Sequence, residues 1–441
     1  MGFLNILWKK ISYDRHLKYS EEHISKIQRL KLINLIKYSY QNSQFYRELL
    51  QDADIYFENI KDLKLEDLPQ TNKKMIMDNF NQLVTNNEID KNSVTEFIEK
   101  NPDPNSLYKD KYYIIHTSGT TGEIGYYIYS KDNWELLKAV GASRLFDHFG
   151  LKRKKYCYVG AVDGHYAGVS FFLSPINKFE QHFYKDFLLV DVNYPLKNYF
   201  DKLNELQPDV ISGYPSVIKM LLDYQQKGNL DIKPQTILCG GEPLTAQTAS
   251  VIEEYWGQIP YNFYGTSESL LMGIGCGQKG MYLFDDLNII EIKEDHILLT
   301  NLYNYTEPLI RYKIDDLTIK IDKENKKWPF TYVQPVSGRE EDLLWLRNKN
   351  GELDFIHPTV FVELHIKGLK QFQVIRTDDK NIRFKAVKKK NIEDSVLKVR
   401  IEKRIDELLN KKKMSNVDLM VDMVKEINMD SNSSKFKLIK T

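Results

Sequence analysis

Residues 113–122 read Tyr-Ile-Ile-His-Thr-Ser-Gly-Thr-Thr-Gly, an apolar run that ends in hydroxyl groups and glycines. The apolar half predicts a buried strand, and the polar half predicts a loop that binds the phosphates of a nucleotide. Glycine lets a backbone approach phosphates closely, and Ser118, Thr120 and Thr121 add hydroxyl donors. No Gly-Lys-Ser/Thr sequence ends the loop, so it is not a Walker A loop. An ordinary turn after a strand remains the alternative for this stretch by itself.

The composition of the chain excludes several classes of protein. Its 441 residues carry a net charge of +1, which argues against a nucleic-acid partner because such partners require a basic excess. Three widely spaced cysteines, Cys157, Cys239 and Cys276, exclude a disulfide scaffold and fit a reducing cytoplasm. No stretch approaches the roughly 18 apolar residues of a membrane span, so we expect a cytoplasmic protein without one.

The pattern of apolar residues predicts an α/β fold. Residues 20–52 and 74–80 have helical periodicity, whereas short apolar runs alternate with helical segments after about residue 112. Such alternation is typical of a sheet with covering helices. The expected strands in this part are residues 155–160, 209–212 and 236–239, followed by a hairpin of residues 288–292 and 296–301.

A change in the pattern of apolar and charged residues near residue 338 predicts two domains. Residues 1–337 form the expected large N-terminal α/β domain, and residues 338–441 form a small, mobile α+β C-terminal domain. The small domain is expected to contain strands at 372–376, 383–387 and 417–424 and a charged helix at 392–410.

Further short motifs follow the phosphate loop along the chain. Gly240-Gly241-Glu242-Pro243 follows an expected strand, where α/β proteins place ligand contacts. The segment Tyr264-Gly265-Thr266-Ser267-Glu268 offers an aromatic face, a glycine and a carboxylate. Two charged segments, 311–316 and 338–342, are by themselves more typical of surface salt bridges than of sites.

In this order, the motifs resemble the adenylate-forming superfamily of acyl-CoA synthetases and adenylation domains. The resemblance is strongest to the phenylacetate-CoA ligase-like branch, which includes CapK-like proteins. Residues 36–46 are similar to the opening helix of that branch, and Leu68-Pro-Gln-Thr-Asn-Lys73 is similar to its "LPxTxK" signature. The similarity covers nearly the whole chain.

The resemblance implies a two-step reaction that uses ATP and Mg²⁺. A small carboxylic acid first attacks the α-phosphate of ATP, which gives an acyl-adenylate and pyrophosphate. A thiol or an amine then displaces AMP. The enzyme must stabilise the negative charge that builds on the α-phosphate and on pyrophosphate.

The resemblance also assigns roles to individual residues. Lys435 matches the mobile catalytic lysine, Glu268 the catalytic acidic residue tied to Mg²⁺, and Arg339 a ribose or phosphate contact. Tyr264 matches the aromatic residue against adenine, and Asp316 the aspartate that binds the ribose hydroxyls. The expected nucleotide-binding residues are Thr117, Ser118, Gly119, Thr120, Thr121, Gly122, Gly241, Glu242, Tyr264, Gly265, Thr266 and Asp316.

Four residues are candidates for the acyl pocket, and one for the hinge between the domains. The pocket candidates are His165, Gly213, Tyr214 and Gly240. Glu341 occupies the hinge position, about which the small domain of this superfamily rotates between the half-reactions.

The chain departs from the superfamily pattern where coenzyme A usually binds. Residues 346–352 replace the "RGxNxxP" motif that backs the pantetheine tunnel. The acceptor therefore stays open between coenzyme A, the phosphopantetheine of an acyl carrier protein and an amine. Cys276 follows the "YGxxE" motif without a nearby histidine, and one thiol does not make a zinc site, so we predict no zinc.

Two other functions compete with the ligase. A non-catalytic CapK-like homologue would bind a nucleotide or partner in a biosynthetic pathway, although Lys435 and Glu268 are both present. A kinase or NTPase of another fold would need the Walker lysine or kinase signatures, which the chain lacks.

Overall fold

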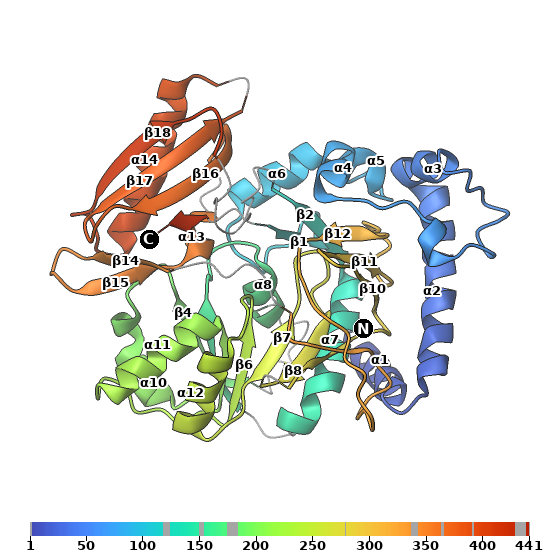
Figure 1. The fold of residues 1–441 in the computed structure, drawn as a ribbon, viewed down its shortest axis with the longest axis horizontal. Helices are drawn as coiled ribbons and strands as arrows, with labels where there is room; N and C mark the ends of the chain where they lie inside the picture. The colour runs from blue at the N-terminus through green and yellow to red at the C-terminus, as the bar shows by residue number, and fades with distance from the viewer. Residues whose placement is uncertain are drawn as a thin grey trace. The chain divides into compact units, whose positions relative to one another are not determined.

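The computed structural model describes residues 2–117, 124–149, 154–173, 184–277, 279–336, 343–362, 366–389, 392–427 and 438–440. The chain forms two compact units (Figure 1). The larger falls within residues 1–116, 126–189 and 202–339, and the smaller within 117–125, 190–201 and 340–441. The boundary predicted at 337/338 lies in 337–342, outside the described residues, and stays a prediction.

A mixed sheet is the centre of the larger unit. Its strands lie in the order β13-β9-β8-β7-β6-β5-β3-β4. Strands β3, β5, β6 and β7 are parallel, whereas β8, β9 and β13 add antiparallel strands beyond β7. The bounds are β3 Lys154–Gly160, β4 Tyr184–Asp191, β5 Val210–Gly213, β6 Thr236–Gly240, β7 Tyr261–Tyr264, β8 Gly273–Cys276, β9 Met281–Leu283 and β13 Tyr332–Val333.

Helices follow the parallel strands, as the alternating pattern predicts. Pro215 occupies the first turn of α11, where its missing N–H costs nothing. The Thr245 side chain accepts a hydrogen bond from Thr248 N at the start of α12, and Gly257 ends that helix with φ +68°. The helices in this part of the chain are α7 Lys131–Phe149, α8 Ala167–Leu173, α10 Phe200–Leu206, α11 Pro215–Gln226 and α12 Ala246–Trp256. The 3₁₀ turn η2 Leu196–Tyr199 belongs to the smaller unit.

The N-terminal segment is helical, which confirms the periodicity of residues 20–52. Ser20 caps α2, and the negative charges of Glu21 and Glu22 in its first turn interact favourably with the helix dipole. The helix expected at 74–80 is divided at Asn79 into α4 and α5. The elements are α1 Gly2–His16, α2 Glu21–Asn42, α3 Gln44–Gln51, η1 Leu65–Asp67, α4 Lys73–Asp78, α5 Phe80–Leu83 and α6 Lys91–Lys100.

The "LPxTxK" segment pairs with strand β12 (Tyr312–Ile314). Thr71 N donates to Arg311 O at 3.1 Å, and Thr71 O accepts from Lys313 N at 2.8 Å. The Arg311 side chain donates to Leu68 O and forms a bidentate ion pair with Glu291 at 2.8 and 2.9 Å. Arg311 is buried, so its ion pair with Glu291 is not one of the surface salt bridges that are typical of such charged segments. Fixing β12 in this way also fixes the residues that it carries.

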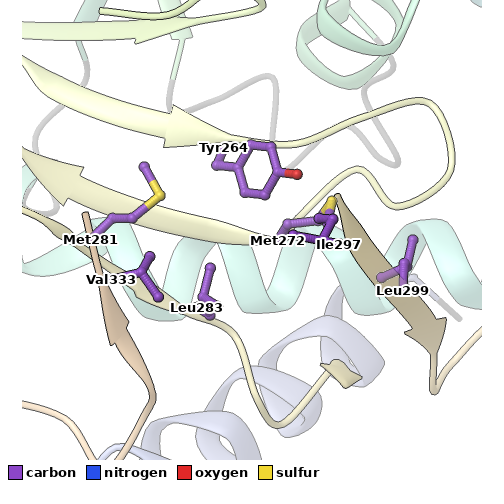
Figure 2. Packing of buried hydrophobic residues seen from close by; sticks show 7 residues of the cluster. All are labelled: Tyr264, Met272, Met281, Leu283, Ile297, Leu299 and Val333. Carbon is purple, nitrogen blue, oxygen red and sulfur yellow. The ribbon is translucent and has the colours of Figure 1, made fainter. Parts of the chain in front are cut away.

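A three-stranded sheet, β10-β11-β12, packs beside the antiparallel part of the central sheet. Strands β10 (Asn288–Ile292) and β11 (Ile297–Asn301) form the predicted hairpin. Seven buried side chains fill the space between the sheets (Figure 2). They are Tyr264, Met272, Met281, Leu283, Ile297, Leu299 and Val333. Burying such side chains stabilises a fold by about 1.5–3 kcal/mol each.

The smaller unit contains the elements that its sequence predicts. Strands β16 (Leu369–Arg376) and β17 (Asn381–Lys388) form the expected hairpin, and β18 (Asp418–Met423) pairs with β17 in parallel. Helix α14 (Asp394–Lys411) buries one apolar face that includes Leu397, Ile401 and Ile405. The other elements are β14 Leu344–Arg347, β15 Leu353–Ile356, α13 Pro358–Val362 and β19 Ile439–Lys440.

Candidate active site

Strands β1 (Tyr112–His116) and β2 (Tyr126–Ser130) flank the predicted phosphate loop as an antiparallel pair. Thr117 N donates to Gly125 O at 2.8 Å, and Gly125 N donates to Thr117 Oγ1 at 2.8 Å. These two bonds close the base of the loop. The loop residues Ser118, Gly119, Thr120, Thr121 and Gly122 lie outside the described residues, so their phosphate-binding role stays a prediction.

Several predicted residues lie at the carboxyl ends of neighbouring parallel strands, the edge where ligands bind in such sheets. Gly213 ends β5, Gly240 ends β6 and Tyr264 ends β7. After β6, Gly241 has φ +81°, and a Cβ there would lie 2.8 Å from the Tyr214 ring. Only glycine suits this close approach.

Glu242 is held at the same edge by the first turn of α11. Its Oε2 accepts hydrogen bonds from Ser216 Oγ at 2.7 Å and from Ser216 N at 3.3 Å. The two turns after β5 and β6 therefore support each other. The structure brings Tyr214, Gly241 and Glu242 together, and their roles towards adenine and the acyl group stay predictions.

Replacement of Gly213 by alanine is expected to destabilise this edge strongly. Gly213 has φ +140°, and a Cβ would lie 1.8 Å from Val159 O. We expect Gly213→Ala to lower the free energy of unfolding by about 3 kcal/mol or more. Urea unfolding measures this change in the free energy of unfolding. Gly228→Ala is the control, because Gly228 also has a positive φ, +76°, but no atom lies within 4 Å of the position of an added Cβ. The control should lose about 1 kcal/mol, and equal losses would contradict the prediction.

The residues expected at adenine and at ribose are in direct contact. Tyr264 Oη donates to Asp316 Oδ2 at 2.8 Å. Burial raises the pKa of Tyr264 well above its ordinary value, and the neighbouring charge of Asp316 adds to this, so the phenol stays a neutral donor. The tyrosine comes from β7 and the aspartate follows β12, so this bond joins the two sheets of the larger unit.

The loop after β7 presents Glu268. A Cβ on Gly265 would lie 2.3 Å from Leu270 O, and Thr266 N donates to Ser269 O at 3.1 Å. These contacts form a tight turn that requires glycine at its start. Glu268 is half-buried, and its backbone oxygen accepts from Asn301 Nδ2 at 3.1 Å.

Tyrosine hydroxyls surround the Glu268 carboxylate. Tyr127 Oη lies 2.9 Å from Glu268 Oε1, and Tyr312 Oη lies 3.3 Å from the same oxygen. A second carboxyl, that of Glu307, is buried nearby and accepts from Ile128 N at 2.8 Å. Sequence reasoning missed Tyr127, Tyr312 and Glu307. Tyr312 lies within the motif at 311–316, but no local signal marks the other two in a chain with 28 tyrosines.

His165 is buried beside the end of β1. Its Nε2 lies 2.6 Å from Asn101 O, and its ring packs against Phe97. Its backbone oxygen accepts from His116 N at 3.1 Å, at the end of β1. Burial lowers the pKa of His165, so the neutral ring is favoured. These contacts hold the turn that carries His165 against the end of β1. The expectation that His165 lines the acyl pocket stays a prediction.

Three further predicted residues fall on segments of the chain that the structure does not describe. Arg339, Glu341 and Lys435 lie outside the described residues, and their roles stay predictions. Among the described residues, no group of three or more His, Cys, Asp or Glu side chains could hold a metal ion, and the expectation about zinc stays a prediction. None of the described helices is long and apolar enough to cross a membrane.

Comparison with known families decides the class of the protein. A family model described as "AMP-binding enzyme" matches residues 49–283, more than half of the chain. The chain belongs to the AMP-binding enzyme family. This membership confirms the resemblance to adenylate-forming ligases and the predicted enzyme class, an AMP-forming acid ligase.

Curated relatives of this family resemble the chain over different lengths. Protein CapK of Staphylococcus aureus is 25% identical over 389 residues, which cover 83% of this chain and 81% of that protein. A phenylacetate-coenzyme A ligase of Thermus thermophilus is 24% identical over 371 residues, 77% and 74% of the two chains. An indoleacetate–lysine synthetase of Pseudomonas savastanoi is 30% identical over 143 residues, 30% and 36%.

A solved structure confirms the fold class. The structure of a 2-hydroxyisobutyryl-CoA ligase, bound to its acyl-adenylate and CoA, has a TM-score of 0.60 to this chain. The two are 18% identical, and the match covers 97% of this chain and 91% of that one. The predicted α/β fold, with a large N-terminal and a small C-terminal domain, is that of adenylate-forming ligases.

Proposed function

We propose that the protein activates a small carboxylic acid with ATP and then transfers the acyl group to a thiol or an amine. In the first step, a carboxylate oxygen bonds to the α-phosphorus, and the bond to pyrophosphate breaks. In the second, the acceptor attacks the acyl carbon, AMP leaves, and the acceptor loses a proton. The observation that carries the proposal is the contact of Tyr264 with Asp316 at the strand end that also carries Glu268.

The Glu268 carboxylate fits a magnesium ion that arrives with the nucleotide. Mg²⁺ takes hard oxygen ligands and is commonly held by one or two protein carboxylates together with substrate phosphates. When bound, the ion would neutralise charge on the phosphates. Tyr264, Gly241 and Asp316 would bind the nucleoside, and the loop from Thr117 would bind the phosphates.

The names of the relatives guide the choice of acid and acceptor. One is named for phenylacetate and coenzyme A, and another for indoleacetate and lysine. Arylacetic acids are therefore the first acids to test. The same names support both a thiol and an amine as acceptor, and the phosphopantetheine of a carrier protein is a further candidate.

Exchange of labelled pyrophosphate into ATP tests the activation step. We expect exchange that requires one acid class from a panel of arylacetic, aryl, amino, fatty and hydroxy acids. ADP as the product would instead indicate a kinase or NTPase. ATP binding without exchange across the panel would contradict the ligase and favour the non-catalytic CapK-like alternative.

Replacement of Asp316 is expected to weaken ATP binding itself. Asp316→Ala should raise the Kd for ATP roughly 10- to 100-fold, because a hydrogen bond to a charged group contributes about 1.5–3 kcal/mol. Calorimetry measures the Kd. Asp315→Ala is the matched control, since Asp315 is the exposed neighbour and should leave the affinity unchanged. Unchanged affinity in Asp316→Ala would contradict the ribose assignment.

A further inference from the structure

Three side-chain oxygens from distant parts of the chain meet beside the expected magnesium position. Tyr127 Oη lies 2.9 Å from Tyr312 Oη and 2.9 Å from Glu268 Oε1, while Tyr312 Oη lies 3.3 Å from Glu268 Oε1. A phenol has one proton to donate, and an ionised carboxylate only accepts. These distances favour one arrangement of the protons. Tyr127 donates its proton to Glu268 Oε1, and the Tyr312 hydroxyl directs its proton towards both Tyr127 Oη and Glu268 Oε1.

The fold holds both tyrosines in place. Tyr127 is 1% exposed within β2, and Tyr312 is 2% exposed within β12. Strand β12 is held by its pairing with Thr71 and by the ion pair between Arg311 and Glu291. A tyrosine hydroxyl is neutral at neutral pH, so both groups can donate to the Glu268 carboxylate.

The carboxyl of Glu307 is buried next to the same cluster. Its Oε2 accepts from Ile128 N, next to Tyr127, whereas its buried Oε1 has no hydrogen-bond partner among the described residues. Burial raises the pKa of Glu307 well above its ordinary value, and the charge of Glu268 raises it further.

We propose that Tyr127 and Tyr312 are positioning residues that hold Glu268 through Oε1 and so present Oε2 to the nucleotide-bound Mg²⁺. Within the described residues, both tyrosine contacts go to Oε1 and no hydrogen bond reaches Oε2. Mg²⁺ demands near-ideal octahedral geometry, so a carboxylate held in one orientation binds it better than a rotating one. The inference rests on the proposed function, because it takes the ion to arrive with ATP.

The test compares ATP binding with and without the metal. Calorimetry gives the Kd of ATP in Mg²⁺ and in EDTA. The Kd in EDTA divided by the Kd in Mg²⁺ measures how much the ion strengthens ATP binding. We expect Tyr127→Phe to lower this ratio about 10-fold, because removing a hydrogen bond that orients a metal ligand commonly costs 10- to 100-fold in metal affinity. Tyr312→Phe should lower it less, since its oxygen lies farther from Glu268 Oε1.

Tyr46→Phe is the matched control for a buried hydroxyl. Tyr46 is 1% exposed, and its Oη bonds to Pro308 O at 3.1 Å and to Ile310 N at 3.0 Å. We expect this variant to lose stability in urea unfolding and to keep the wild-type ratio. The Mg²⁺ dependence of ATP binding is therefore a readout that a merely structural role would not change.

The outcomes separate this inference from the proposed function. Equal weakening of ATP binding by Tyr127→Phe in Mg²⁺ and in EDTA would overturn the positioning role and leave the ligase proposal intact. A wild-type protein that binds ATP equally with and without Mg²⁺ would overturn the metal role of Glu268 itself. A lowered ratio in Tyr127→Phe supports the inference even if no acid in the exchange panel is activated.

Discussion

Lys435→Ala is expected to lower the rate of acyl-adenylate formation about 10³-fold. The resemblance makes this ammonium group the one that meets the charge on the α-phosphate and pyrophosphate. This charge grows only in the transition state. Loss of the lysine should therefore reduce the rate with little change in the Kd of ATP. Exchange of pyrophosphate into ATP measures the first step, and consumption of a supplied acyl-adenylate in a single turnover measures the second.

The second half-reaction provides the internal comparison for Lys435. Transfer from the supplied adenylate should fall less than about 10-fold, because pyrophosphate has already left. Lys437→Ala, two residues farther along the same tail, is the matched control and should behave as wild type. Equal losses in both half-reactions would contradict the assigned role and indicate a general defect of the small domain.

Glu268→Gln is expected to lower adenylation about 10²- to 10³-fold. The amide keeps an oxygen that can accept from Tyr127 and Tyr312, so the tight turn from Gly265 should persist. It lacks the negative charge that makes a carboxylate a strong ligand for Mg²⁺. The concentration of Mg²⁺ that gives half-maximal pyrophosphate exchange should therefore rise together with the loss of rate.

A surface carboxylate controls for the loss of charge. Glu253 is exposed on α12, and Glu253→Gln should leave both the rate and the Mg²⁺ requirement unchanged. If Glu268→Gln lost activity at an unchanged Mg²⁺ requirement, the carboxylate would serve the fold or the substrate and not the ion. Urea unfolding of the Glu268→Gln variant then shows whether the carboxylate serves the fold, because only that role lowers the free energy of unfolding.

Local patterns determined much of the fold from the sequence. The hairpin of β10 and β11, the hairpin of β16 and β17 and helix α14 lie within a few residues of their predicted bounds. Each is set by interactions between residues that are close in the chain, namely the alternation of strands, the apolar period of a helix and the chemistry of a turn. The antiparallel strands that extend the central sheet beyond β7 were not predicted, because neighbours in a sheet are chosen by long-range pairing.

For the site, the sequence by itself determined the order of the motifs, and with it the family. It placed Tyr264, Glu268 and Asp316 on the list of candidates without showing that Tyr264 bonds to Asp316. Lys435 is assigned through the resemblance alone, whereas the loop from Ser118 to Gly122 is assigned from its glycines and hydroxyls together with the resemblance.

Only the tertiary structure decided how the Glu268 carboxylate is held. Tyr127 and Tyr312 are 141 and 44 residues from Glu268 along the chain, and Arg311 is buried by contacts to Leu68 and Glu291. No periodicity specifies which of many tyrosines will meet one carboxylate, because that depends on the register of strands from separate parts of the chain. The physical reason is that burial and hydrogen bonding at this site come from the packing of β2, β7 and β12, which no local segment contains.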